Sequence, residues 1–587
     1  MAASSARRGI WIGLLAVVVL LLGLAVWFAL SARTAVNEMT VARDSLVAAR
    51  DAVADGQPQQ ARTFVTAASD AASRASDRVN GPLWNVVAAI PGIGDTPQTA
   101  QAVATSLDQT LTALRPLTEQ LDVLDPTSLI SEGTVDVSAI QSALPAMKEA
   151  APGVDEAVAT VADAPMDGLV LPQVRTAAQD YTEELLGVQS TLSTGVTFGE
   201  IAGPLLGAYG RKRYFVGILN PNEARGTGGF MGSWAVVTAK DGKVTVDQVG
   251  SNTQIPDLTA LPAGLSDGFE ERYRDDPILR GNMNLSPNFP DTAKIWLAAW
   301  KQKTGERLDG VIAADVVALG ALVEASGARV PLPNGTSLTG DQLADFAIKG
   351  IYEQFPTAAQ ATERKAYQDA IVRTAVELTT QAPKPEGMAE AMGKGLSEGR
   401  IVVWSADPKV EKKLMAAGVG GSLTVGDGHN VQFVALNGSG SKLDAFLERS
   451  VTYQVGRCPT NDGRVISTVT AELVNAIPLG ERPPDYMISQ ARVGPTGPIN
   501  VILAQFHLPH GADIEKVTVN GKRVSWFPFT ESGRPSAMVD VTLPPRKPVR
   551  VAVSFTEAAS EKAVDVAVQP LATDQPTQVV DVGCTEG

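Results

Sequence analysis

The sequence predicts a multidomain protein with an N-terminal transmembrane helix, an α-helical bundle, an α/β domain with a mixed sheet, and a C-terminal β-sandwich. Three observations predict this order. An uncharged apolar run lies close to the N-terminus, a long segment then repeats apolar residues at three- and four-residue spacing, and the remainder passes from mixed strands and helices to short strands alone. A chain of 587 residues is also long enough for several folded units.

The apolar run Ile10–Leu30 predicts a membrane span. It contains no charged residue, and as a helix it covers about 30 Å, the thickness of the hydrocarbon core of a bilayer. Arg7 and Arg8 directly precede it, so the positive-inside rule places residues 1–9 in the cytoplasm and the bulk of the chain outside. A cleaved signal peptide is the alternative, but the run is longer than a signal core and Ala29–Ser31 is a poor cleavage site. We therefore expect an uncleaved, single-pass protein of the cell membrane.

Composition limits the partners and the redox state. The formal net charge of −15 argues against nucleic acid, because phosphate backbones are bound by basic surfaces, although it does not exclude a local site for an anion. The cysteines Cys458 and Cys584 both lie late in the chain. Outside the cell they are expected to form a disulfide, which would stabilise the fold by roughly 4 to 5 kcal/mol. A reactive thiol would need a histidine partner, and the sequence shows no sign of one nearby.

Residues 31–210 are expected to form an extracytoplasmic helical bundle. Apolar residues recur at helical spacing, for example at Met39, Ala42, Leu46 and Ala49, and short breaks between such segments imply antiparallel helices. The breaks fall at 55–58, 80–82, 91–94, 125–126 and 165–172.

Residues 211–437 alternate strand and helix patterns, which predicts the α/β domain. The strands are expected at 214–219, 230–238, 244–249, 310–314, 400–404 and 431–436, and the helices at 291–304, 316–326, 340–352, 363–380 and 408–417. The irregular stretch 250–290 interrupts this order. Because long loops inside compact domains are usually functional or mobile, this stretch is either a lid over the turn that contains Arg225 or a solvated surface loop.

Residues 438–587 predict the β-sandwich. They contain short alternating apolar runs, few helical signals, and turn signals at Asn520–Gly521 and Ser532–Gly533. The strands are expected at 451–455, 464–473, 499–507, 516–519, 525–529, 536–543 and 549–555.

The stretch Leu219–Trp234, LNPNEARGTGGFMGSW, is the main candidate for a functional site. Its proline, asparagines and glycines lie between two apolar runs, and such residues let a backbone turn sharply and approach a ligand closely. Arg225 lies in the middle of it. An arginine here is either a ligand clamp or a structural tie to nearby carbonyls, and residue type alone favours the tie.

This stretch also carries a family resemblance. NPNEARGTGGFMGSW is followed by VVTAKDGKVTV, SPNFPDTAKIW and LDGVIAADVVALGALVEASG, and this order resembles the uncharacterised bacterial family called domain of unknown function 4012, from about Trp84 to Tyr453. More weakly, the same segments are similar to the LytR-CpsA-Psr family. Members of that family use arginines, acidic residues and Mg²⁺ to pass a polyprenyl-pyrophosphate-linked glycan to peptidoglycan.

The LytR-CpsA-Psr resemblance implies four ligand-binding residues. Arg225 takes the place of the arginine in that family's Arg-Ser-Asp-Thr turn, and Asp257 falls where the family has Pro-Arg-Asp. Arg364 and Gln368 match an Arg-x-x-Arg-Gln helix in which Tyr367 replaces the second arginine. The resemblance further implies that Arg225 and Arg364 share one pocket and bind a phosphate of an envelope lipid or glycan carrier, a task suited to paired guanidinium donors.

Other chemistries find little support. His429 is isolated, and His507 and His510 flank a strand end in a way that does not aim both rings at one metal, so no metal site is expected. Without a histidine near a plausible serine, a Ser-His-Asp hydrolase is not expected either. The segment Ser439–Lys442 has the spacing of a Ser-x-x-Lys nucleophile but lies in a glycine-rich turn, which favours a structural turn.

We therefore expect a membrane-anchored, extracytoplasmic protein that serves as a structural or ligand-binding component of the cell envelope and needs no cofactor. Its expected partners are the membrane and an envelope glycan or lipid-phosphate carrier. The alternative is a Mg²⁺-dependent glycopolymer transferase of LytR-CpsA-Psr type. Convergence of Arg225, Arg364 and an acidic residue such as Asp257 on one phosphate group would favour the transferase.

Overall fold

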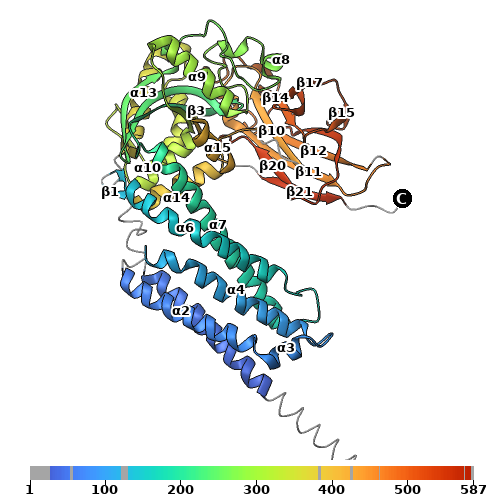
Figure 1. Cartoon of the computed structure of the whole chain (residues 1–587). Helices are drawn as coiled ribbons and strands as arrows, with labels where there is room; N and C mark the ends of the chain where they lie inside the picture. The colour runs from blue at the N-terminus through green and yellow to red at the C-terminus, as the bar shows by residue number, and fades with distance from the viewer. Residues whose placement is uncertain are drawn as a thin grey trace, which may run out of the picture. The chain divides into compact units, whose positions relative to one another are not determined.

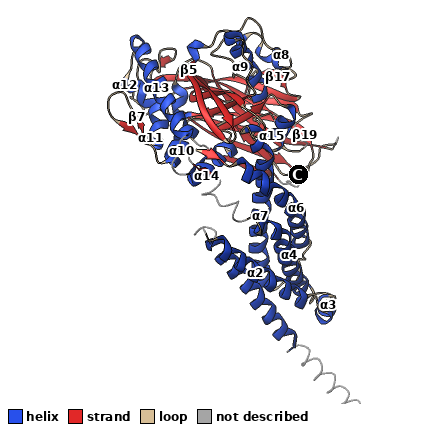
Figure 2. Cartoon of the chain, turned by 60° about the vertical axis from the view of Figure 1, so that its left-hand side comes forward, coloured by secondary structure: helices blue, strands red, loops and turns tan. Residues whose placement is uncertain are grey.

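The computed structural model describes residues 27–52, 57–120, 130–131, 133–380, 385–423, 428–461, 463–573 and 576–582, and it combines helices and sheets (Figures 1 and 2). The chain forms two compact units. One comprises Met1–Leu129 and Asp136–Gly203, and the other comprises Ile130–Val135 and Pro204–Gly587.

Most of the predicted membrane span Ile10–Leu30 lies outside the described residues. Within the described part of the chain, no helix combines the length and the apolar character that crossing a bilayer requires. The span therefore stays a prediction.

The first unit is a helical bundle with many small residues in its core. Its helices are residues 27–52, α2 (Pro58–Val79), α3 (Pro82–Ala88), α4 (Asp95–Thr118), α6 (Val137–Ala162) and α7 (Pro172–Leu205). Proline in the first turn suits the starts of α2 and α3, and the Asp136 carboxylate caps α6 by accepting a hydrogen bond from the backbone N–H of Ala139. Buried alanines such as Ala68 and Ala72 let neighbouring helices approach closely.

The second unit is built around a seven-stranded mixed sheet. Its strands, in spatial order, are β1 (Ile130–Ser131), β2 (Thr134–Val135), β5 (Lys243–Ser251), β4 (Gly228–Lys240), β3 (Lys212–Arg225), β6 (Gly310–Asp315) and β9 (Ile401–Ser405). β3 and β6 are parallel, whereas β3 pairs with β4 and β6 pairs with β9 in antiparallel fashion. Alternate residues of β3 face opposite layers, so Tyr214 and Val216 join one core and Phe215 joins the other.

Helices cover both faces of this sheet (Figure 2). On the Tyr214 side lie α10 (Val316–Ser326), α11 (Gly340–Asp345), a π-helical turn (Phe346–Gly350), α12 (Ile351–Gln354) and α13 (Ala361–Thr380). On the Phe215 side, α8 (Phe269–Tyr273) and α9 (Phe289–Thr304) contribute to the core. Two further helices, α14 (Pro385–Ser397) and α15 (Pro408–Ala416), flank β9 in the sequence. Trp296 of α9 lies so close to Gly217 of β3 that a Cβ there would lie 2.4 Å from the ring.

The glycine-rich stretch is an extended hairpin rather than a long turn. β3 continues through Pro221 to Arg225, and a short turn joins it to β4. The predicted ends of these strands, at residues 219 and 230, are therefore wrong. The physical reason is a shift in register between Asn220 and Ala224, since this irregularity accommodates a proline that cannot donate to the ladder.

The segment 250–290 folds over the Arg225 turn, one of the two expected alternatives, and is not a solvated loop. The Gly281 carbonyl accepts a hydrogen bond from Arg225 (3.2 Å), and the Asn284 amide donates to the Gly229 carbonyl (2.8 Å). Ile255, Phe269, Tyr273 and Met283 are buried against the sheet and α9, so the segment supplies part of the hydrophobic core. Its apolar residues are spaced irregularly, so neither helical nor strand periodicity predicted that they are buried in the core.

The same segment is held by a hairpin of the β-sandwich, β17 (Phe527–Glu531) and β18 (Arg534–Leu543). The buried Glu531 carboxylate accepts hydrogen bonds from the hydroxyls of Tyr273 (3.0 Å) and Ser286 (2.6 Å). Burial raises the pKa of Glu531 to about 7, although both hydroxyls and Arg272 act to lower it.

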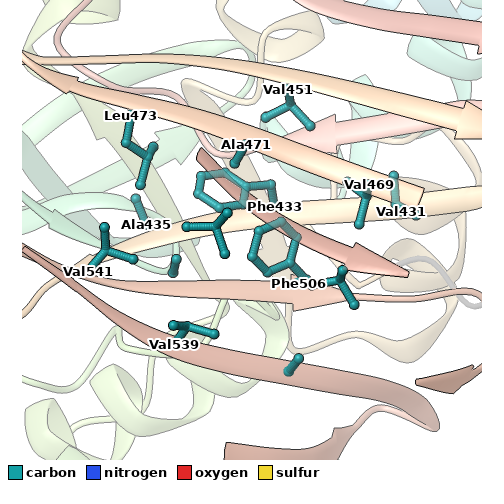
Figure 3. Packing of buried hydrophobic residues seen from close by; sticks show 14 of the residues in the cluster. Val431, Phe433, Ala435, Val451, Val469, Ala471, Leu473, Phe506, Val539 and Val541 are labelled. Carbon is teal, nitrogen blue, oxygen red and sulfur yellow. The ribbon is translucent and has the colours of Figure 1, made fainter. Parts of the chain in front are cut away.

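The β-sandwich consists of two six-stranded sheets. One contains β17, β18, β14 (Gly497–His507), β10 (Asn430–Asn437) and β20 (Asp565–Val568), with β13 (Arg492–Gly494) beside β14. The other contains β16 (Lys522–Arg523), β15 (Asp513–Val519), β19 (Val549–Ala558), β12 (Arg464–Asn475), β11 (Leu447–Gly456) and β21 (Thr577–Val582). Phe433 and Phe506, 5.0 Å apart, pack between the sheets with residues such as Val451 and Val469 (Figure 3).

The sandwich differs from the prediction in where it begins. β10, which was assigned to the α/β domain, lies inside a sandwich sheet between β14 and β20. The α/β layer and the sandwich also belong to one compact unit rather than to separate ones. The pattern of β10 is that of a buried strand, and a buried strand has the same pattern in either sheet.

The strand pair β11 and β21 bears on the predicted disulfide. The two strands run parallel, with Gly456 opposite Val582, and Cys458 and Cys584 each follow two residues later in the sequence. Cys584 lies outside the described residues, so the disulfide stays a prediction.

Candidate functional site

Arg225, at the end of β3, is tied into the fold on several sides. Its guanidinium donates to the Glu223 carboxylate (2.6 Å), to the backbone carbonyl of Ala224 (3.0 Å) and to that of Gly281 (3.2 Å). It also lies 5.5 Å from the ring centre of Phe230. Of the two roles that the sequence left open, these contacts support the structural tie.

Lys442 binds the other oxygen of the same carboxylate. Its ammonium lies 2.7 Å from Glu223 Oε2. Burial lowers the pKa of Lys442, but Tyr352 and Glu223 raise it more, to about 12, so the side chain stays charged. In the Ser-x-x-Lys segment the hydroxyls of Ser439 and Ser441 bond to each other (2.8 Å). That segment is therefore a turn that positions Lys442 beside Glu223.

Arg364 approaches Lys442 from α13. Its guanidinium donates to the backbone carbonyl of Phe355 (2.9 Å) and lies 3.5 Å from the ring centre of Tyr486. The ammonium of Lys442 lies 5.7 Å from the centre of the same ring. Tyr486 therefore contacts both cations through its electron-rich ring.

Lys365 directly follows Arg364 on α13 and lies beside a glycine of β4, and Asp369 is one turn further along the helix. Lys365 donates to the carbonyl of Gly232 (2.6 Å) and pairs with Asp369 (3.2 Å), which also accepts a hydrogen bond from Ser233 (3.2 Å). Burial lowers the pKa of Lys365, and the nearby Lys442 lowers it further, while Asp369 acts in the opposite direction. A Cβ built on Gly232 would meet no atom within 4 Å, so the space beside it is open.

These side chains form what we call the cationic cluster. Its cations are Arg225, Arg364, Lys365 and Lys442, and the carboxylates beside them are Glu223, Asp369 and Asp444. Burial raises the pKa of Asp444 to about 6, although hydrogen bonds from one backbone N–H group and two side-chain amides stabilise the charged carboxylate and act to lower the pKa. Burial likewise raises the pKa of Glu223, but Lys442 and Arg225 lower it more, so it falls below its usual value. The cluster thus keeps an excess of positive charge in a chain whose net charge is −15.

The four residues implied by the LytR-CpsA-Psr resemblance are brought together only in part. Arg225 and Arg364 reach the same cluster, on either side of Lys442, and Gln368 lies half-buried one turn after Arg364. Asp257 instead accepts a hydrogen bond from the backbone N–H of Arg280 (2.9 Å). It does not contact either arginine of the cluster.

Mg²⁺, which the transferase alternative implies, does not fit these residues. Mg²⁺ is usually held by one or two carboxylates that are open to it. Here Glu223 and Asp369 are each paired with a cation. Nowhere in the described ranges do three or more His, Cys, Asp or Glu side chains gather in a way that could hold a metal ion.

A cleft of about 680 Å³ opens next to the cluster. Met487 and Pro484 line it, and they are sequence neighbours of Tyr486, which faces Lys442 and Arg364. Its polar lining includes Lys349, Glu353, Glu448, Glu481, Arg482 and Arg546. Neither Arg225 nor Arg364 lines this cleft.

The sequence did not single out two of the four cations as ligand candidates. Lys365 directly follows Arg364, and this adjacent pair of basic residues on a predicted helix is the sequence feature that could have identified Lys365 as a ligand candidate. Lys442 was considered only as part of a nucleophile motif. Its place beside Glu223, more than two hundred residues away in the chain, depends on how the sandwich packs on the sheet.

Comparison with known proteins finds a family likeness over one part of the chain. No curated protein matches the chain. Residues 209–352, which run from just before β3 into α12 and include Glu223, Arg225 and Asp257, match the model of a family described as "Protein of unknown function (DUF4012)". The resemblance expected from about Trp84 to Tyr453 is thus supported over a shorter stretch, and it is over residues 209–352 that this chain is similar to the DUF4012 family.

Proposed function

We propose that this chain is a membrane-anchored, extracytoplasmic component of the cell envelope that binds an anionic, phosphate-bearing glycan or lipid carrier at the cationic cluster. The single observation that carries the proposal is the gathering of four cations in one cluster, of which Lys365 lies beside the open space at Gly232. The anchor rests on the apolar run Ile10–Leu30 and on the arginines that precede it.

The cluster suits the binding of an anion. Lys365 lies at its rim, where a phosphate oxygen would replace the carbonyl of Gly232 as a partner of the ammonium. Lys442 and the two arginines lie deeper and supply a fixed positive potential. The adjacent cleft leaves room for the remainder of a bulky ligand.

Binding without group transfer accounts for these contacts better than catalysis does. Transfer of a phosphate-linked glycan needs cations aimed at the charge that develops on the leaving group. The N–H groups of Arg225 bond to Glu223 and to carbonyls, and Arg364 bonds to Phe355. The likeness to LytR-CpsA-Psr ligases is therefore proposed to extend to ligand class and not to the reaction.

The test is a calorimetric titration of the full chain in detergent with inorganic pyrophosphate. Lys365→Gln should weaken binding about tenfold or more, because it removes a charge-assisted hydrogen bond. Lys412→Gln, at an exposed lysine of α15, is the matched control and should leave the affinity unchanged. Equal affinities for Lys365→Gln and the unaltered chain would exclude the cluster as the site.

Two further measurements separate binding from catalysis. Mass spectrometry of lipids and glycans that co-purify with the full chain would identify the ligand class. Incubation with a polyprenyl-pyrophosphate-linked glycan, peptidoglycan and Mg²⁺ should yield no transfer product. Product formation that depends on Lys365 would establish the transferase instead.

A further inference from the structure

Helix α3 of the helical unit is apolar on two opposite sides. Trp84 and Ala88, four residues apart, are buried in the bundle. Leu83 and Val86, three residues apart, face outward, and Val86 is 63% exposed. A surface helix in water normally carries polar residues on its outer side, so an apolar outer side is typical of a helix that meets an apolar environment.

The outer side of α3 continues into a wider apolar surface. The loop between α6 and α7 lies beside the start of α4, because the backbone N–H groups of Leu169 and Leu171 donate to the side chains of Asp95 (2.7 Å) and Thr96 (3.0 Å). Leu169 is 74% exposed. We call this surface the apolar rim, and its exposed members are Leu83, Val86, Ile90, Ile93, Leu169 and Leu171.

The apolar rim lies where the predicted membrane span ends. Trp84 packs on Phe28 with ring centres 4.4 Å apart and ring planes tilted by 42°, and its indole N–H donates to the Ser31 hydroxyl (2.9 Å). Phe28 belongs to the last turn of the run Ile10–Leu30. Within the described residues, the N-terminal end of the helix of residues 27–52 therefore lies beside α3.

We propose that the apolar rim is a second membrane contact, which rests in the interfacial layer of the outer surface of the bilayer and sets the helical unit against it. The proposal rests on the membrane anchor proposed above. Residues 81–94 contain no charge, as a segment that rests against lipid requires. The described helix of residues 27–52 includes the last four residues of the predicted span, so the rim lies close to where that span would leave the lipid, and the insertion of each apolar side chain would add to the anchoring.

The test compares two positions that are exposed to similar extents. Val86→Cys lies in the rim, whereas Val47→Cys, on the helix of residues 27–52 and 50% exposed, lies about 24 Å further along that helix from Ser31. The full chain is labelled with an environment-sensitive NBD maleimide under non-reducing conditions and is placed in lipid nanodiscs with or without doxyl-labelled lipid. The unaltered chain reports any labelling of Cys458 and Cys584.

The label at Val86 should shift to shorter emission wavelength and lose fluorescence when doxyl lipid is present, and the label at Val47 should do neither. An anchored chain whose Val86 label stays in water overturns the proposal. A second copy of the chain could instead cover the rim. In that case the emission of the Val86 label would shift to shorter wavelength in detergent as protein concentration rises, and doxyl lipid would not quench its fluorescence. Release of the chain from vesicles by alkaline carbonate would show instead that the anchor itself is absent, and both proposals would fail.

Discussion

Replacement of Glu223 by glutamine separates the structural role of the cationic cluster from its proposed binding role. The side chain is only 10% exposed, and its two oxygens bind Arg225 (2.6 Å) and Lys442 (2.7 Å). Glu223→Gln removes the charge that compensates both cations. Loss of one partner from a buried ion pair costs about 3 to 5 kcal/mol, and we expect the lower end because a glutamine oxygen still accepts one hydrogen bond. Binding of pyrophosphate by the folded protein should become tighter, because the cations lose a competing anion.

The assay is urea unfolding at pH 7, followed by tryptophan fluorescence. Trp234, Trp296 and Trp300 are buried in a core of the same unit and report its unfolding. Glu515→Gln, at an exposed carboxylate of β15, is the matched control and should change the free energy of unfolding by less than about 0.5 kcal/mol. The pH dependence provides a check, because a carboxyl with a lowered pKa stabilises the fold above its usual pKa of 4.5 and loses that effect as pH falls through its value in the folded protein. The gap between the unaltered chain and Glu223→Gln should therefore narrow in acid.

Two outcomes would refute the reasoning. An unchanged free energy of unfolding would show that the carboxylate does not hold the two cations together. A destabilised variant that binds pyrophosphate more weakly would place the anion away from the cluster.

Three further predictions follow from other parts of the chain. The pKa of Glu531 is raised from 4.5 to about 7, so its contribution to stability is present below pH 4.5 and is lost as pH rises through 7. In urea unfolding, Glu531→Gln should remove up to about 3 kcal/mol of that pH dependence. Parallel pH profiles of the unfolding free energy for the variant and the unaltered chain would contradict this. Peptide mapping without reduction should recover a Cys458–Cys584 disulfide from protein made in its native envelope, whereas two alkylatable thiols there would count against it. Reporter fusions at the two ends should place the N-terminus in the cytoplasm and the C-terminus outside, and a mature protein that begins near Ala32 would rule out the anchor.

Local patterns carried much of the organisation of the chain. The helix α10 runs from Val316 to Ser326 as predicted, because an aspartate caps its start and a glycine ends it. The breaks at Asn80–Gly81 and near Pro172 likewise separate helices in the structure. In these places the deciding interactions join residues a few positions apart, and the sequence shows them directly.

The candidate site could be predicted only in part. Arg225 and Arg364 were found by resemblance, but their partners were not, because a sequence does not show which carbonyl or carboxylate will face a guanidinium. The continuation of β3 past Pro221 and the burial of residues 250–290 were missed for a related reason. Both depend on packing against distant strands and helices, and that packing overrides local turn preferences.

The sequence by itself determined that this protein is acidic, that an uncharged apolar run stands near its N-terminus, and that helical periodicity gives way to strand periodicity along the chain. Only the tertiary structure decided that β10 joins the sandwich, that Lys442 meets Glu223, and that the apolar residues around α3 lie beside Phe28. The physical reason is the distance along the chain over which each effect acts. Periodicity and capping depend on residues a few positions apart, whereas the charge balance and the exposure of a site depend on groups that folding brings together from distant parts of the chain.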